Sequence, residues 1–369
     1  MPRRFIVLFA IFVISAFPSV GSTIENSFES AQVCKECHTD IYKNWKQSLH
    51  ALSYKNPIFT NAYRKAYTTT AGKAKKYCLN CHAPTVRVTG DYDISLPVTA
   101  EGVTCDFCHT ITEIHLDGRA KNIINKPGDT KRSVLKNAES GHHNTEFSND
   151  FASSKLCGGC HDFHNRQGVH VGVTYSEWEE SSFAKEGKQC QNCHMPEISG
   201  KTANEGGRDK IHDHSLSHNV ATMKGAIVVT TEDIQKDKKK LKAKIRITNQ
   251  KAGHSIPTGT PARSLVLEVK ALDKKGRMLE IKKIVYKKVI LDKKGNELSE
   301  DGDVFLYGEK IVSDNRLRPD ESRLETFIFT KNLKKINKIT AEAYFLYKPI
   351  VNTQTDMSIP LSSGEWKVK

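Results

Sequence analysis

Cysteine is absent from every position outside one short motif, and no cysteine follows residue 193 in this 369-residue chain. Long apolar runs are absent as well, because the stretch of residues 5–17 is shorter than the roughly 18 to 20 residues that a membrane-spanning helix needs. The first absence leaves no spare thiol for a disulfide outside the motif. The second makes an uncleaved membrane anchor the weaker interpretation of the N-terminus.

All ten cysteines belong to five Cys-x-x-Cys-His motifs. A disulfide framework or paired zinc sites would also use ten cysteines, but neither requires a histidine directly after the second cysteine. The pattern is the covalent attachment site of c-type haem, in which two thiols join one porphyrin and the histidine ligates its iron. The sequence therefore predicts five covalently bound haem c groups. The first to fifth motifs are Cys34/Cys37/His38, Cys78/Cys81/His82, Cys105/Cys108/His109, Cys157/Cys160/His161 and Cys190/Cys193/His194.

The first residues have the organisation of a secretory signal peptide. Arg3 and Arg4 precede the apolar stretch, and small residues follow it at Ser19 and Gly21. We expect residues 1–21 to be removed and the mature protein to be periplasmic or extracellular. No cysteine lies beside the expected cut, which disfavours a lipid-anchored product.

The formal net charge of +14 would suit a nucleic-acid partner if the polypeptide were the whole molecule. Five haems add ten propionates, so the formal value falls to roughly +4 and we expect no nucleic-acid binding. The charge is also uneven, because residues 231–369 hold 30 Lys and Arg against 19 Asp and Glu. With the propionates and without the signal peptide, the first part becomes roughly −9. An acidic half is therefore expected to precede a basic half.

The cysteine distribution divides the mature chain into two predicted domains, residues 22–225 and 226–369. The first domain has about 41 residues for each of five haems, so the haems must form much of its core. Short helices and long loops are expected there, with helices over residues 41–50 and 174–185 and a surface excursion over residues 122–149. A further helix is predicted over residues 232–240, at the start of the second domain.

The second domain has alternating apolar residues and short turn segments such as Asp273–Gly276 and Asp292–Gly295. A period of two with close spacing predicts an antiparallel β-sandwich of immunoglobulin-like type. The overall fold class is therefore α+β, a mainly helical and irregular haem domain followed by a β-sandwich. The expected strands cover residues 226–230, 241–248, 264–271, 279–290, 322–330 and 339–347.

The second face of each iron decides the chemistry, because an iron with two imidazole ligands cannot bind a substrate and an iron with one open face can. Ten histidines lie outside the motifs, enough for every second face. We predict second ligands at His50, His143, His214, His218 and His254. The remaining five are His115, His142, His164, His170 and His212.

Several of these histidines leave alternatives open. His142 and His143 are adjacent, so the pair is expected to supply one ligand, or two ligands to different haems. His214 and His218 would share a face if they lay on a helix. His164 and His170 follow the fourth motif closely and are equally consistent with ligation and with a surface position.

His254 lies in a loop of the second domain, residues 249–261, whose path is restricted by glycine and proline. If this loop reaches back and the imidazole caps a haem, the β-sandwich is docked rigidly on the haem domain. The alternative is a turn with an incidental histidine.

The motif surroundings resemble a known family. Residues 34–56 read CKECHTDIYKNWKQSLHALSYKN, residues 102–109 read GVTCDFCH, and residues 190–196 read CQNCHMP. These segments, with residues 156–161 and 174–178, resemble multihaem cytochromes of the cytochrome c-554/c-prime type. The resemblance implies stacked and edge-on haem pairs, mostly bis-histidine ligation, electron transfer in respiratory chains, and second ligands at His50 and in the His214/His218 region.

The resemblance leaves three functions to compare. An electron carrier that passes electrons between redox partner proteins is the leading hypothesis, and the chain is expected to be a carrier more than an enzyme. A related pentahaem nitrite reductase or hydroxylamine oxidoreductase would act on small nitrogen or sulfur compounds at one open haem. Nitrite reductases of that group carry Cys-x-x-Cys-Lys, whereas all five motifs here end in histidine, which weakens that assignment. Self-association into an extracellular haem filament is the third hypothesis.

Overall fold

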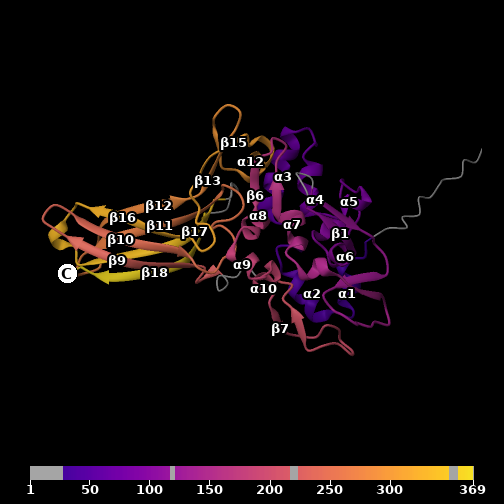
Figure 1. Ribbon diagram of the computed structural model, residues 1–369. Coiled ribbons are helices and arrows are strands. Elements are labelled where there is room, and N and C mark those ends of the chain that lie inside the picture. Colours follow the sequence, from indigo (N-terminus) through magenta and orange to yellow (C-terminus); the bar gives the residue numbers. More distant parts are fainter. Residues whose placement is uncertain (1–27, 117–120, 217–222, 349–355, 369) are drawn as a thin grey trace, which may run out of the picture.

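The computed structural model describes residues 28–116, 121–216, 223–348 and 356–368 (Figure 1). The short helices gather at one end of an elongated molecule and the long strands at the other. In the described part of the chain, no helix is both long enough and apolar enough to cross a lipid bilayer.

The haem-binding half, which the structure describes from residue 28 to 216 except 117–120, has the short helices that the sequence predicts, and two-stranded ribbons take the place of part of the expected long loops. Its helices are α1 (Ala31–Lys35), α2 (Thr39–Lys46), α3 (Pro57–Thr69), α4 (Lys75–His82), α5 (Val86–Thr89), α6 (Cys105–His109), α7 (Lys155–His161), α8 (Thr174–Glu179), α9 (Ser182–Lys185) and α10 (Cys190–His194), with 3-10 turns η1 (Thr99–Glu101) and η2 (Asn149–Ala152). Its ribbons pair β1 (Ile111–His115) with β2 (Asn122–Asn125), β3 (Thr130–Ser133) with β4 (Asn144–Phe147), β5 (Asp162–His164) with β6 (His170–Val173), and β7 (Glu197–Ser199) with β8 (Lys210–His212).

The attachment motifs coincide with helix ends. Helices α4, α6, α7 and α10 each end on the histidine of a motif, and α1 holds the first cysteine of the first motif. One helical turn places residues i, i+3 and i+4 on the same side. The two thiols and the imidazole of a motif could therefore hold one porphyrin between them.

The other half contains two antiparallel sheets. The three-stranded sheet has the order β16–β10–β9, and the four-stranded sheet has the order β12–β11–β17–β18. The strands are β9 (Ile227–Lys236), β10 (Leu241–Asn249), β11 (Arg263–Leu272), β12 (Met278–Tyr286), β16 (Ser322–Phe329), β17 (Lys338–Tyr347) and β18 (Met357–Lys367), and the 3-10 turn η3 (Leu333–Lys335) precedes β17.

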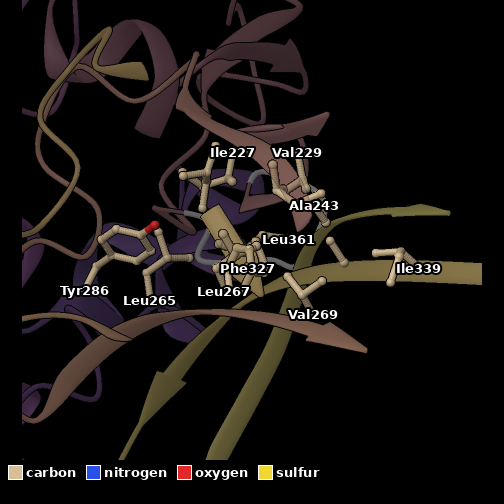
Figure 2. Close-up of a cluster of buried hydrophobic side chains, with 14 of the residues drawn as sticks. Ile227, Val229, Ala243, Leu265, Leu267, Val269, Tyr286, Phe327, Ile339 and Leu361 are labelled. Carbon is tan, nitrogen blue, oxygen red and sulfur yellow. The ribbon is translucent and has the colours of Figure 1, made fainter. Parts of the chain in front are cut away.

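One continuous apolar core lies between these two sheets. Leu265 and Leu267 of β11 meet Ala243 of β10 and Phe327 of β16 in a single buried cluster (Figure 2). The burial of β10 alternates strictly along its length, which is why the period-two pattern of the sequence located this strand correctly. The immunoglobulin-like type itself, and the domain boundary at 225/226, stay predictions.

An insertion between β12 and β16 joins the two halves. It consists of β13 (Lys288–Leu291), β14 (Glu297–Leu298), α12 (Asp301–Tyr307) and β15 (Lys310–Asp314). Ile290 and Val304 of the insertion pack against Val169 and Val171 of the haem-binding half, and α12 lies against α3 (Figure 1). The junction between the halves therefore has an apolar core of its own.

Two elements of the sequence prediction are wrong. Residues 232–240 do not form a helix, because β9 continues to Lys236 and pairs with β10 around a turn in which Asp237 Oδ1 accepts from the backbone N–H of Lys239 at 2.6 Å. Residues 279–290 do not form one strand, because β12 and β13 belong to different sheets. The predicted helix over 174–185 is divided in two, with Ser181 capping α9.

Candidate functional site

Backbone carbonyl groups orient the histidines of three motifs. His82 Nδ1 lies 3.0 Å from the Ser53 carbonyl oxygen and His109 Nδ1 lies 2.6 Å from that of Arg132. His38 Nδ1 makes the same contact with the Thr202 carbonyl. A ring nitrogen that faces a carbonyl carries the proton, so Nε2 keeps its lone pair for a metal.

Four of the histidines predicted as second ligands each face one motif histidine. The distances between ring centroids are 6.1 Å for His38 and His143, 6.2 Å for His161 and His50, 6.4 Å for His109 and His214, and 6.3 Å for His194 and His254. A metal–imidazole bond is about 2.0–2.1 Å, so two rings on opposite sides of one metal have centroids about 6.3 Å apart. The four pairs fit an iron held between two imidazoles.

The second histidines have the same proton placement as the motif histidines. His143, His214 and His254 turn Nδ1 toward the backbone carbonyls of Asn144, His212 and Ser255, at 3.1, 2.7 and 3.1 Å. Their Nε2 atoms are therefore the available metal-binding nitrogens.

Burial favours the neutral imidazole that binds a metal. Burial lowers the pKa of His214 to about 4, and it also lowers the pKa of His109 and His82. A neutral ring at ordinary pH needs no proton release before ligation, so these sites are prepared for iron.

The second motif has a different environment. The Phe59 ring stacks on the His82 ring with centroids 3.8 Å apart and planes 12° apart, and Tyr54 and Tyr63 belong to the same aromatic cluster around Leu79. Within the described residues, no second histidine faces His82 at the spacing of the four pairs. The predicted ligand His218 lies outside the described residues.

The thiols and the imidazole of a motif do not converge on a point. The described residues contain no group of three or more His, Cys, Asp or Glu side chains that could hold a bare metal ion. A structural zinc site would require such convergence, whereas haem c needs thiols at the porphyrin edge and an imidazole at its centre. The donor set therefore fits covalently attached haem c.

Thiols of different motifs touch one another. The Cys160 thiol donates a hydrogen bond to Cys81, which lowers the pKa of Cys81 to about 7. The Cys157 thiol does the same for Cys190, whose pKa is also lowered to about 7. Since Cys157 and Cys160 both belong to the fourth motif, that motif contacts the second motif on one side and the fifth on the other.

The first and third motifs form another contact. The Cys105 thiol donates a hydrogen bond to Cys34 and lowers its pKa. Cys108 of the third motif is also near enough to Cys157 and Cys160 to act on them electrostatically. The contacts connect the motifs in the order first, third, fourth, with the second and fifth motifs both beside the fourth.

Cys37 and Cys193 are the second cysteines of the first and fifth motifs. Cys193 is exposed, and Cys37 is half-buried while its carbonyl accepts the N–H of Asn204 at 2.8 Å. Among the residues that the structure describes, neither thiol takes part in the hydrogen bonds that join one motif to another. The expectation that haems form much of the core of this half stays a prediction. Attachment of haem at all ten cysteines stays a prediction.

Two glycines allow other side chains to pack closely against the fourth motif. The sequence alone did not predict this role. A Cβ atom on Gly158 would come within 2.8 Å of the Tyr175 side chain, and one on Gly159 within 2.7 Å of Ile123. These glycines separate the two cysteines of the fourth motif, so the motif can be enclosed on all sides. Two glycines between the cysteines of one motif are the signal that could have located the central site.

Gly102 has a similar role before the third motif. Its φ is +76°, and a Cβ atom there would lie 2.6 Å from the His50 carbonyl oxygen. The next residue, Val103, donates its N–H to the same carbonyl at 3.0 Å. The close approach positions the segment that carries His50 against the third motif.

The histidines that the sequence left open have other surroundings. His115 Nε2 lies 3.0 Å from Glu113 Oε2 on the surface. The His164 and His170 rings face each other in the β5–β6 ribbon with centroids 4.2 Å apart, too close for a metal between them. Of the adjacent pair, His143 faces the histidine of the first motif.

Comparisons with known proteins agree with this donor set. Residues 33–110 match the family model described as cytochrome c554 and c-prime. A penta-heme cytochrome c552 from Thermochromatium tepidum is similar in fold, with a TM-score of 0.74 and 24% sequence identity over 92% of this chain and 99% of that chain. Since the identity is below 25%, this likeness shows the fold alone.

Other solved structures are similar over a smaller part of the chain. A β-glucuronidase from Bacteroides uniformis has 12% identity and a TM-score of 0.19, over 40% of this chain and 13% of that chain. A β-glucosidase from Kluyveromyces marxianus has 12% identity and a TM-score of 0.17, over 39% and 14%. With TM-scores this low, neither of these structures indicates a fold or a function for this chain. No curated protein sequence matches the chain.

Proposed function

We propose that this multihaem cytochrome c relays electrons through five covalently bound haem c groups, with redox proteins as its donors and acceptors. The observation that supports the proposal most strongly is the set of four histidine pairs at 6.1 to 6.4 Å. An iron with two imidazole ligands stays low-spin and binds no substrate. Such a site suits electron transfer more than catalysis.

In this proposal each pair holds one iron. His38 and His143 serve the first motif, His109 and His214 the third, His161 and His50 the fourth, and His194 and His254 the fifth. Haem c supplies a one-electron iron couple, and the protein sets each potential through ligands, burial and nearby charge. The carbonyl groups at Nδ1 keep each ring in place and make it a stronger donor.

The route follows the thiol contacts. The Cys34–Cys105 contact joins the first and third motifs, and the Cys81–Cys160 and Cys157–Cys190 contacts join the second and fifth motifs to the fourth. Each thiol is bonded to a porphyrin edge in haem c, so touching thiols bring two edges into close neighbourhood. The fourth motif is then a junction with three neighbours. The exposed thiol Cys193 would place the outer edge of the fifth haem toward solvent, where a redox partner protein can approach.

The location and the second half are part of the proposal. Cytochromes c of this type are typically exported, which supports residues 1–21 as a signal peptide and a periplasmic or extracellular respiratory role. Sheet orders β16–β10–β9 and β12–β11–β17–β18 correspond to strands E-B-A and C′-C-F-G of an immunoglobulin-like sandwich. We therefore assign residues 22–225 to the haem domain and residues 226–369 to this sandwich.

Mass spectrometry and EPR of the oxidised protein test the proposal together. We expect the mass of five haems and spectra dominated by low-spin ferric iron. The variant H143A should convert one haem to the high-spin form, whereas H142A, its direct neighbour, should leave the spectrum unchanged. Fewer than five haems, or high-spin iron in most of the sites, would exclude a relay of this kind, and turnover of nitrite or hydroxylamine would support the enzyme hypothesis instead.

A further inference from the structure

One carboxylate of the haem-binding half accepts two hydrogen bonds from the loop that carries His254. Glu177 of α8 directs Oε2 toward the loop, where it accepts the backbone N–H of Ser255 at 3.2 Å and the hydroxyl of Thr258 at 2.8 Å. Ser255 directly follows His254 and also receives the contact from His254 Nδ1 through its carbonyl. The carboxylate therefore holds the backbone on the C-terminal side of the imidazole.

A buried arginine completes this attachment from the other half. Arg316 Nη1 lies 2.7 Å from Glu177 Oε1 as an ion pair, and the two side chains are only 6% and 10% exposed. The same nitrogen donates to the Pro257 carbonyl at 3.1 Å, while Nη2 pairs with Asp314 Oδ2 at 2.7 Å. Arg316 thus connects the carboxylate, the loop and β15 in one buried network.

Close packing fixes the other side of the loop. A Cβ atom on Gly253 would lie 3.2 Å from the Phe183 side chain and 3.3 Å from that of Trp178. The hydroxyl groups of Thr174 and Thr258 share a hydrogen bond of 2.7 Å. His254 is therefore held from both neighbouring residues by α8 and α9, the helices that lead into the fifth motif.

We infer that Glu177 is the positioning residue that places His254 on the iron of the fifth haem, and that the β half is thereby the supplier of that haem's second ligand. This inference rests on the proposed pairing of His194 with His254. Glu177 touches neither the iron nor the porphyrin in this scheme. It acts through the Ser255 N–H and through Arg316.

The chemistry of the network explains why a carboxylate is required. One oxygen accepts from two donors of the loop and the other faces a guanidinium, so every contact needs an acceptor or a negative charge. Glutamine has one acceptor oxygen and one NH₂ group. Its NH₂ would oppose either Arg316 or the Ser255 N–H, and a buried cation or donor left without its partner is strongly destabilising.

The test compares E177Q and E177A with H254A and K65A in the full holoprotein. Lys65 also joins the two halves, through Glu300 and Asp303 and not through Glu177, and it serves as the matched control. The measurements are the ferric EPR spectrum, the number of CO molecules bound by the reduced protein, and the response to added imidazole. Haem content and the signals of the other haems report whether each variant has folded.

We expect E177Q and E177A to develop the high-spin signal of one haem and to bind one more CO than the wild type, as H254A does. Added imidazole should restore the low-spin form in all three variants, and unchanged signals of the other haems should show that none of them has lost its structure generally. K65A should have the wild-type spectrum. Folded E177Q and E177A proteins with wild-type spectra would overturn the inference while leaving the pairing intact. A wild-type spectrum for H254A would overturn the pairing itself, and with it the inference.

Discussion

Each half of the molecule is stabilised internally by a different kind of core. The β half has one continuous apolar cluster that runs through both of its sheets (Figure 2). The haem-binding half has separate smaller clusters, one around Phe107 and Ile114, one around Tyr42 and Trp45, and one around Leu79. The β half therefore has one core made by its own side chains, whereas the described apolar side chains of the haem-binding half form several small clusters and no single core.

This difference follows from what each half must bury. Small domains without a sufficient apolar core need cross-links, metals or cofactors for stability. In the proposed function the cysteines and histidines of the haem-binding half hold porphyrins, and Gly158 and Gly159 lie so close to Tyr175 and Ile123 that a larger residue would not fit at either position. The cofactors are then structural as well as functional there, while the β half can serve as a preformed support for His254.

The largest effect should come from withholding haem. A chain produced without haem attachment should lose the ordered structure of the haem-binding half and keep the sheets of the β half, because only the latter has an independent core. Hydrogen exchange with peptide resolution measures this. Peptides of β10 and β11 should stay protected while those of α4, α6 and α7 exchange fully. Equal protection of both halves in the haem-free chain would contradict the comparison.

The second largest effect tests the β core directly. Phe329 is fully buried at the end of β16, and its neighbour Ile328 is 46% exposed on the opposite face. Replacement of a buried phenylalanine by alanine costs about 3–5 kcal/mol, so F329A should lower the free energy of unfolding of the β half by that amount. I328A should cost less than about 1 kcal/mol. Urea unfolding followed by the fluorescence of Trp366 in β18 gives both values, and similar losses for the two variants would be inconsistent with this core.

Features that depend on a short local motif could be predicted from the sequence, and features that depend on the fold could not. Each attachment motif is five contiguous residues whose chemistry requires no knowledge of the fold, so all five could be identified from the sequence. The burial of each motif could not, because the exposure of Cys193 and the enclosure of Cys160 depend on which motifs become neighbours. His254 was singled out because glycine and proline mark a loop of defined path, and its ligation of iron stays a prediction. The helix predicted over 232–240 was wrong because a lysine-rich, polar segment gives little periodic signal, and pairing with β10 decided its structure.

Contacts between residues far apart in the chain could not be predicted from the sequence. Glu177 and Arg316 lie 139 positions apart, and neither belongs to a local motif. The insertion of β13, α12 and β15 likewise interrupts the sheet pattern without a marker in its composition. The pairing of four histidines with particular motifs required the fold, because the partners come from loops and ribbons between other motifs.

A pH-dependent effect of intermediate size is expected at the junction. Lys288 is 2% exposed, burial lowers its pKa to about 8, and its Nζ donates to the His170 carbonyl at 2.9 Å. The unfolded chain keeps this proton up to about pH 10.4, so it binds more protons than the native state between pH 8 and 10. This group therefore makes the native state more stable as pH rises through that window and penalises it below pH 8.

The variant K288M isolates this contribution. Between pH 7.5 and 9.5 the stability of the wild type should rise relative to K288M by about 2 kcal/mol. K287M replaces the exposed neighbour that pairs with Glu297 and should keep the wild-type pH dependence. Urea unfolding at the two pH values measures the difference. An identical pH dependence of K288M and wild type would show that Lys288 does not titrate in this range.

The smallest effect is expected from the exposed ion pairs between the halves. Lys65 of α3 lies 2.5 Å from Glu300 and 2.8 Å from Asp303, and its side chain is 44% exposed. Exposed ion pairs contribute about 0–1 kcal/mol and weaken with salt, so K65A should lower the unfolding free energy by less than about 1 kcal/mol at low ionic strength. The difference from wild type should vanish near 1 M salt. A larger loss that persists in high salt would mean that α3 and α12 depend on this charge, and that the junction is held by surface electrostatics instead of by Ile290, Val304 and the buried Glu177–Arg316 pair.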